Sequence, residues 1–263
     1  MKSAYNETRV LTNEKISDNV YKMTVLCNDV TRPGQFFMLR NWGTSSPYLS
    51  RPISICDDEY GKLTFLYLAT GKGTKLFAKL KTGDKINLLG PQGNGFDIEK
   101  LTKDTVKKIA VVAGGIGIAP FLYLAKELKK KDIELDFFAG YTNQPYFVYE
   151  MEPYFDKINI FTLEDNTVLQ ENPFSDNEKI KLQPGYPTDT FNEDDYDYVL
   201  SCGPTPMMNA LKNKMKNKEK LYISLENHMG CGIGVCLSCS CKTKNAMKKV
   251  CTGGPIFNAA ELE

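Results

Sequence analysis

Apolar and polar residues alternate along much of the first 95 residues, and this period of two predicts half-buried β-strands. The segment 20–27, VYKMTVLC, shows the alternation most plainly. The turn signal Pro33-Gly34 precedes a second such segment. Together the segments predict strands at 20–27, 35–40, 51–56, 62–69 and 85–89, with one short helix at 75–80. Strands at this spacing are typical of a small antiparallel barrel or sandwich.

From about residue 100 the pattern changes to continuous apolar runs separated by helical periods. The run at 108–113, KIAVVA, is typical of a strand covered on both faces. Further strands are expected at 134–139, 159–162, 196–201 and 221–224, and helices at 121–131 and 207–218. This alternation predicts a doubly wound parallel sheet. The polar, aperiodic stretch 167–184 is expected to be a surface excursion, and no chemistry is assigned to it.

The 263 residues are enough for two ordinary domains and a short third segment. We expect a β-barrel domain at 1–98, an α/β nucleotide-binding domain at 99–224 and a cysteine-rich segment at 225–263. The net charge of +1 gives no reason to expect nucleic acid or an anionic membrane as a partner. The sequence shows no long apolar run and no evident signal peptide, so we expect a cytoplasmic protein with no membrane span.

The cysteine-rich segment holds the most specific motif of the chain. Cys231, Cys236 and Cys239 have the spacing C-x4-C-x2-C, and Cys251 follows after a short basic stretch. This is the plant-type ligand spacing of a 2Fe–2S cluster, which needs four thiolates. A structural zinc knuckle is the alternative, but zinc sites usually pair their cysteines in two separate short units. Clustered rather than dispersed cysteines also favour metal ligation in a reducing compartment over a disulfide framework.

Two glycine turns follow predicted strands of the α/β region. Residues 114–120, GGIGIAP, lie between a strand and a helix, where backbone N–H groups can receive a pyrophosphate. Residues 202–204, CGP, occupy the equivalent position after a later strand. Each turn alone could be a plain connection, and Cys202 alone could be a small buried hydrophobe. Two such turns in one sheet strengthen the prediction of a nucleotide site.

Two weaker motifs lie in the β region. Residues 51–54, RPIS, combine a guanidinium and a hydroxyl beside a proline, a combination that can hold a phosphate and a flavin edge. Residues 71–74, GKGT, precede the predicted short helix and offer backbone N–H groups to a phosphate. Taken alone, residues 51–54 are better explained as an ordinary edge-strand proline, and residues 71–74 could equally be a plain turn.

The order of these four motifs resembles that of the ferredoxin reductase superfamily, over nearly the whole chain. The resemblance implies an antiparallel β-barrel that binds FAD, followed by a doubly wound α/β domain that binds a nicotinamide nucleotide. Within the superfamily, residues 226–257 are most similar to the electron-transfer subunits of NAD-linked dihydroorotate dehydrogenases. The resemblance therefore implies three cofactors, namely FAD, a 2Fe–2S cluster and NAD.

The resemblance also assigns residues to these cofactors. The cluster ligands are Cys231, Cys236, Cys239 and Cys251. The FAD contacts are Arg51, Pro52, Ile53, Ser54, Leu66, Tyr67, Leu68, Gly73 and Thr74. The nicotinamide side holds Gly114, Gly115, Gly117, Pro120, Cys202, Gly203 and Pro204. Leu68 departs from the basic residue that relatives often carry, and Cys241 is an extra thiol that could replace Cys239.

The function implied is that of an oxidoreductase subunit in pyrimidine (UMP) biosynthesis. Electrons pass from an FMN-containing catalytic partner through the cluster and FAD to NAD+, with two copies of each subunit in a heterotetramer. No side-chain acid or base is expected, because the cofactors carry the chemistry. One alternative is the flavin/nicotinamide subunit of an anaerobic sulfite reductase or sulfhydrogenase, and another is a non-catalytic zinc-stabilised binding module.

Overall fold

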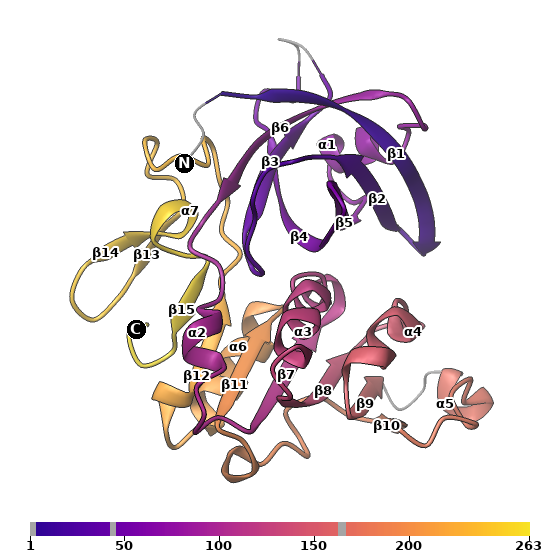
Figure 1. The fold of residues 1–263 in the computed structure, drawn as a ribbon, viewed down its shortest axis with the longest axis vertical. Coiled ribbons are helices and arrows are strands. Elements are labelled where there is room, and N and C mark those ends of the chain that lie inside the picture. The colour runs from indigo at the N-terminus through magenta and orange to yellow at the C-terminus, as the bar shows by residue number, and fades with distance from the viewer. Residues whose placement is uncertain (1–3, 43–45, 163–166) are drawn as a thin grey trace. The chain divides into compact units, whose positions relative to one another are not determined.

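The computed structural model describes residues 4–42, 46–162 and 167–263, and the chain divides into two compact units (Figure 1). One unit holds the N-terminal residues up to Phe96 together with Leu225–Ile256 and Glu263. The other unit holds Asp97–Ser224 and Phe257–Leu262. Among the described residues, none forms a helix long and apolar enough to cross a membrane.

Six strands of the first unit close into an antiparallel barrel in the order β1-β2-β5-β4-β3-β6. The elements are β1 (Asn6–Ser17), β2 (Val20–Leu26), β3 (Phe36–Arg40), β4 (Arg51–Glu59), β5 (Lys62–Leu68), α1 (Lys72–Phe77) and β6 (Lys85–Gln92). The inward positions fill the barrel, where the rings of Phe37 and Phe65 meet edge to face with centroids 6.1 Å apart. The prediction of an antiparallel barrel is confirmed.

Strand β1 was not assigned individually from the sequence. Its twelve residues are mostly exposed or half-buried, and among them Val10 alone is buried. The strand is fixed by its pairing with β2 on one side and β6 on the other. Closure of the barrel therefore depends on backbone hydrogen bonds that the hydrophobic pattern does not reveal.

A seven-stranded sheet in the order β10-β9-β8-β7-β11-β12-β15 is the centre of the second unit (Figure 1). The strands are β7 (Lys108–Gly114), β8 (Glu134–Gly140), β9 (Lys157–Thr162), β10 (Ile180–Pro184), β11 (Tyr198–Cys202), β12 (Leu221–Ser224) and β15 (Ile256–Asn258). The helices are α2 (Ile98–Leu101), α3 (Phe121–Lys129), α4 (Val148–Met151), α5 (Val168–Glu171) and α6 (Thr205–Lys214). All pairs from β10 to β12 are parallel, as predicted.

The expectation of a surface excursion at 167–184 is wrong. This stretch contains α5 and then β10, which pairs in parallel with β9 and extends the sheet. Strand β10 lies at the sheet edge, and of its five residues Ile180 alone is buried. An edge strand with one buried side chain has no hydrophobic period to detect, so its polar sequence was misinterpreted as a loop.

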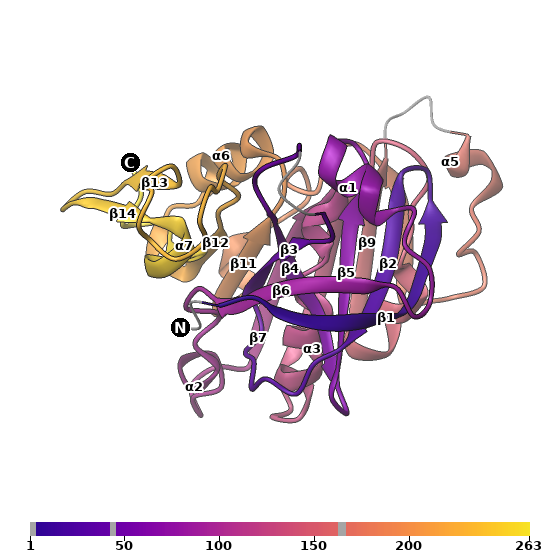
Figure 2. The same ribbon diagram turned by 90° about the horizontal axis from the view of Figure 1, so that it is seen from above.

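The cysteine-rich segment contains more regular structure than its sequence predicted. Strands β13 (Ser240–Lys242) and β14 (Met247–Lys249) form an antiparallel hairpin that leads into α7 (Val250–Gly253), as Figure 2 shows. The main chain of Gly254 accepts a hydrogen bond from Asn94 N at 2.6 Å, just beyond the last barrel strand. The Asn94 side chain also donates to the oxygen of Ile256 at 3.0 Å. This contact joins the segment to the barrel within one unit.

Candidate cluster and nucleotide sites

The four predicted cluster ligands form two pairs, which we call the outer pair (Cys231 and Cys236) and the inner pair (Cys239 and Cys251). In the outer pair, Cys236 N donates to Cys231 Sγ at 3.4 Å, and the two thiols are hydrogen-bonded. In the inner pair, Cys251 N lies 3.5 Å from Cys239 Sγ, and these thiols are hydrogen-bonded as well. Cys231 is close enough to Cys251 to influence it electrostatically, so the two pairs are neighbours.

The hairpin explains how two cysteines twelve positions apart become a pair. Ser240 lies opposite Lys249 in the β13–β14 register, and Val250 N donates to Cys239 O at 3.0 Å. Cys239 immediately precedes the first strand and Cys251 lies just after the second, so closing the hairpin brings them together. The extra thiol, Cys241, lies on β13 opposite Lys248 and belongs to neither pair.

The outer pair is shaped by a glycine loop. Gly232 and Gly234 adopt φ values of 73° and 81°, where glycine alone has no steric penalty. A Cβ on Gly230 would lie 3.1 Å from Cys236 Sγ, so glycine leaves the space beside that sulfur open. The N–H of Ile233 points at Cys231 Sγ from 3.4 Å. Backbone donors directed at sulfur stabilise thiolates, which is the form that binds iron.

The pKa values of Cys236 and Cys251, one thiol from each pair, are shifted in opposite directions. Hydrogen bonds from Ser238 and Cys231 lower the pKa of Cys236 to about 6. Burial, together with the neighbouring Cys239, raises the pKa of Cys251 to about 12. Burial also raises the pKa of Cys241. Cys236 therefore loses its proton readily, whereas Cys251 becomes a ligand when a cation replaces its proton.

The two cysteine pairs match in number the ligands that two iron ions need. A 2Fe–2S cluster needs two thiolates on each iron. The outer and inner pairs supply that number with the backbone donors already in place. The donor set therefore fits the predicted cluster.

The glycine loop also packs directly on the barrel. A Cβ on Gly232 would lie 2.4 Å from Met38 Cγ, which shows how closely the loop approaches β3. Met38 is opposite Pro52 in the pairing of β3 with β4, and Leu39 is opposite Arg51. The predicted cluster ligands and the predicted flavin motif are thus separated by one barrel strand within one unit.

The structure brings Arg51 and the 71–74 motif together. A Cβ on Gly73 would lie 2.7 Å from Arg51 Nε, so glycine lets the guanidinium approach the start of α1. Arg51 Nη1 donates to the main-chain oxygen of Leu49 at 2.5 Å. Thr74 Oγ1 accepts from Gly71 N at 3.1 Å, which fixes the turn. A fixed guanidinium beside free helix-start N–H groups suits a phosphate.

The predicted β5 residues differ in accessibility. Leu66 and Tyr67 are 2% and 1% exposed, and Leu68 is half-buried. The Tyr67 hydroxyl donates to Asn13 Oδ1 at 2.9 Å, and burial raises its pKa. Of the 51–54 motif, Pro52, Ile53 and Ser54 are all half-buried in the pairing of β4 with β3.

Sequence reasoning missed Trp42, the single tryptophan of the chain. Its ring stacks on Phe77 with centroids 5.4 Å apart, and the Arg51 guanidinium lies 5.6 Å from its centroid. The buried Trp42 Nε1 finds no acceptor among the residues that the structure describes. A buried N–H without a partner is costly, and a polar cofactor edge would satisfy it. The sequence feature that could have identified Trp42 was its position shortly before the 51–54 motif.

The two glycine turns of the second unit meet at the carboxyl ends of β7 and β11. Cys202 lies opposite Ala113 in the sheet, and a Cβ on Gly117 would lie 2.4 Å from Cys202 O. A Cβ on Gly114 would lie 2.8 Å from Pro204 Cδ. Gly203 has a φ of 154°, and Pro120 precedes α3 as its N-cap. The chain runs outward from β7 through β10 and returns to β11, so the turns meet at the topological switch point, the usual ligand position.

A scan against family profiles matches residues 226–263 to the iron–sulfur cluster binding domain of dihydroorotate dehydrogenase B. This match covers the outer and inner pairs, the hairpin and α7. The prediction of an iron–sulfur segment at the C-terminus is confirmed at the level of the family.

Sequence similarity to known proteins extends over the whole chain. The electron transfer subunit of dihydroorotate dehydrogenase B (NAD(+)) from Clostridium acetobutylicum is 41% identical over 263 residues, which is 100% of this chain and 98% of that protein. The protein of the same description from Clostridium perfringens is 38% identical, with 100% of both chains covered.

Among solved structures, one of an NADH-dependent reduced ferredoxin-NADP oxidoreductase superposes with a TM-score of 0.77 at 23% identity, covering 97% of this chain and 89% of that one. A ferredoxin NADP+ reductase from Neisseria gonorrhoeae superposes with a TM-score of 0.61 at 16% identity, covering 83% and 97%. These two likenesses confirm the ferredoxin-reductase fold. On the full-length sequence similarity, the chain belongs to the family of electron transfer subunits of dihydroorotate dehydrogenase B (NAD(+)).

Proposed function

We propose that this chain transfers electrons from a dihydroorotate-oxidising partner subunit to NAD+. The observation that carries the proposal is the position of the outer and inner cysteine pairs against the barrel strand that pairs with Arg51 and Pro52. A cluster held there lies beside a flavin held by the barrel. When bound, the FAD exchanges single electrons with the cluster and a two-electron hydride with NAD+.

The residues of this chain bind and orient rather than react. Arg51, Gly73 and Trp42 hold the flavin side, and the turns at 114–120 and 202–204 hold the nicotinamide nucleotide. Met229, 9% exposed, and the buried inner pair exclude water from one side of the cluster. Burial of this kind tunes a cluster's potential, so the chain sets the driving force through packing.

The partner is an FMN-containing dihydroorotate dehydrogenase catalytic subunit, and the assembly holds two copies of each subunit. Val235 and Leu237 flank Cys236 and are 74% and 59% exposed. Apolar side chains around an exposed ligand suit a docking surface, so the partner binds over the outer pair. Thiolate ligands need a reducing compartment, which supports a cytoplasmic location.

One variant tests the electron path. Cys236→Ser removes an outer ligand, so we expect loss of the visible absorbance of the cluster and loss of partner-dependent NAD+ reduction with dihydroorotate, while FAD stays bound. Cys241→Ser is the matched control, because this thiol belongs to neither pair, and it should retain both signals. Activity retained in Cys236→Ser, or a wild-type complex that uses sulfite in place of dihydroorotate, would contradict the proposal.

A second variant tests the flavin side. Arg51→Ala removes a charge-assisted contact, so FAD retention should weaken roughly tenfold or more. Arg9→Ala is the control, because Arg9 is a surface arginine of the same barrel that donates to Gly83 O. Flavin content is measured after gel filtration at low protein concentration. Unchanged flavin content in Arg51→Ala would remove Arg51 from the site.

A further inference from the structure

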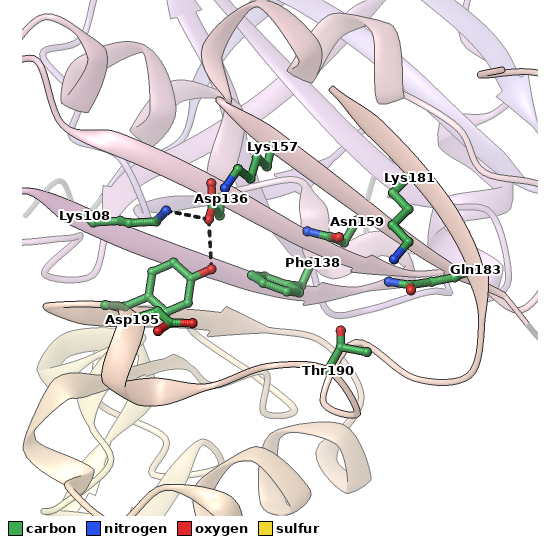
Figure 3. A pocket seen from close by; sticks show the side chains of 10 residues that line it. Lys108, Asp136, Phe138, Lys157, Asn159, Lys181, Gln183, Thr190 and Asp195 are labelled. Atoms are coloured by element: carbon green, nitrogen blue, oxygen red, sulfur yellow. Dashed lines mark hydrogen bonds and ion pairs between the residues drawn. The ribbon is translucent and has the colours of Figure 1, made fainter. Parts of the chain in front are cut away.

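The second unit contains a cavity of about 560 Å³ that the electron path does not use. Figure 3 shows lining residues on one face of β7 to β10, with Thr190 and Asp195 from the chain that returns to β11. Tyr196 of the same returning chain also lines the cavity. In a doubly wound sheet such a face is normally covered by a helix. Here the return includes a single short 3-10 helix, η3 (Glu193–Asp195), and leaves the cavity open.

Aromatic rings form one rigid wall of this cavity. The ring of Phe138 meets those of Phe191 and Tyr196 edge to face, with centroids 5.8 Å and 6.1 Å apart. Phe191 and Tyr196 stack on each other at 5.6 Å. The returning chain is also fixed from outside, because Lys216 N donates to Glu193 Oε2 at 2.7 Å. The cavity is therefore a built feature of the unit rather than a loose loop contact.

A buried carboxylate at one end of the cavity has one oxygen without a partner. Asp136 is 2% exposed. Its Oδ2 accepts from the Tyr196 hydroxyl at 2.8 Å and pairs with Lys108 Nζ at 3.1 Å. Its Oδ1 is buried and accepts no hydrogen bond from the residues that the structure describes. A buried carboxylate oxygen without a donor is costly, so this end of the cavity suits an N–H group.

The rest of the cavity is cationic and polar. Lys157 lies opposite Asp136 in the sheet, and Lys181 lies opposite Asn159 on the next strand. Neither lysine forms an ion pair with another residue of the described ranges. The amides of Asn159 and Gln183 lie along the same face. Strand spacing places Lys181 roughly 10 Å from the strand of Asp136, which is the length of a small organic molecule.

The cavity is separate from the predicted nicotinamide site. Lys108 and Lys157 begin β7 and β9, whereas Gln183 lies near the carboxyl end of β10. The glycine turns lie at the carboxyl ends of β7 and β11. Gln183 is level with Gly114 in the sheet register, but the three strand steps from β10 to β7 separate them by roughly 14 Å. A ligand of this cavity would leave the turns accessible to NAD.

We propose that this cavity binds a small organic anion with an N–H donor at one end and a carboxylate or phosphate at the other. The N–H group donates to Asp136 Oδ1, and the anionic group binds Lys181 at the other end. Phe138 packs against the body of the molecule. The ligand regulates the subunit from this second site. Its binding does not require the electron path proposed above.

The test is calorimetric titration of the FAD-loaded chain with NAD at saturating concentration. Orotate carries ring N–H groups and a carboxylate, and uridine 5′-phosphate carries a ring N–H and a phosphate. Uridine lacks the anion and inorganic phosphate lacks the N–H. We expect one of the first two to bind at least about tenfold more tightly than uridine and phosphate, since each charged contact is worth about a factor of ten.

Substitutions in the lining test whether the measured heat of binding comes from a ligand in this cavity. Lys157→Gln with Lys181→Gln should weaken binding about tenfold or more, whereas Lys103→Gln, an exposed lysine outside the lining, should not. NADH-dependent reduction of an artificial acceptor should be the same in all three proteins. Equal binding by the double variant, equal binding of inorganic phosphate, or no binding of either compound up to about 10 mM would overturn the proposal.

Discussion

The outer and inner cysteine pairs lie side by side but are built differently. Cys236 is exposed and Cys231 half-buried, whereas Cys239 and Cys251 are 2% and 1% exposed. The outer pair is held by a loop whose glycines adopt positive φ values, and the inner pair by the register of a hairpin. The predicted set of four ligands thus combines an adaptable half and a rigid half.

This difference implies separate tasks for the two halves. A buried pair in a hairpin is pre-positioned and dry, which favours a fixed potential. An exposed pair on a glycine loop is reachable by iron during assembly and by a partner afterwards. The hydrogen bonds from Ser238 that lower the pKa of Cys236 supply a thiolate at neutral pH, and burial that raises the pKa of Cys251 withholds one. We therefore expect iron to enter through the outer pair.

Removing iron should expose the difference most strongly. After chelation under reducing conditions, Cys236 should react with a thiol reagent at least about 100-fold faster than Cys251, because reaction needs an accessible thiolate. Mass spectrometry of the peptides at successive times gives the ratio. Raising the pH from about 6 to 9 should change the Cys236 rate little and leave Cys251 slow. Equal labelling rates would remove the distinction between the two pairs.

The barrel and the parallel sheet were predictable because most of their strands carry apolar residues in a regular pattern that the fold buries. Segments such as β2 and β7 carry apolar residues at the positions that the fold buries. Strands β1 and β10 carry one buried residue each, and they are fixed by pairing with distant neighbours. Neither an edge position nor backbone pairing produces a hydrophobic pattern in the sequence. Strands β1 and β10 were therefore not predicted.

The candidate site shows the same limit. The spacing of Cys231, Cys236 and Cys239 predicts which thiols bind a cluster, but not how they pair. The pairing depends on the β13–β14 register, and the docking of the loop depends on Asn94 and Met38, far away in the sequence. Trp42 likewise comes beside the predicted flavin motif only through its stack on Phe77 and the approach of Arg51. Such long-range contacts are properties of the fold and have no local sequence signal.

A pair of serine substitutions tests the burial of the inner half. Cys251→Ser and Cys236→Ser each remove one ligand, so both should lose the cluster. Cys251→Ser also places a hydroxyl in a buried site, which should lower the free energy of unfolding by about 2 kcal/mol more than Cys236→Ser does. Chemical denaturation of the two cluster-free variants, measured side by side, gives the difference. Equal stabilities would mean that the inner pair is not the rigid half.

The smallest expected effect concerns the packing of the glycine loop against the barrel. Gly232 and Gly83 have positive φ values of 73° and 91°, so alanine at either position should cost about 1 kcal/mol in backbone strain. A Cβ at Gly232 would also lie 2.4 Å from Met38 Cγ, whereas a Cβ at Gly83 meets nothing within 4 Å. Gly232→Ala should therefore be less stable than Gly83→Ala by a further 1 kcal/mol or so, because Met38 is fully buried and must move. Thermal unfolding of the two variants measures the difference, and iron content shows whether the displaced loop still binds a cluster. If both variants unfold at the same temperature, the glycine loop does not rest on β3, and the outer pair loses its structural link to the flavin motif.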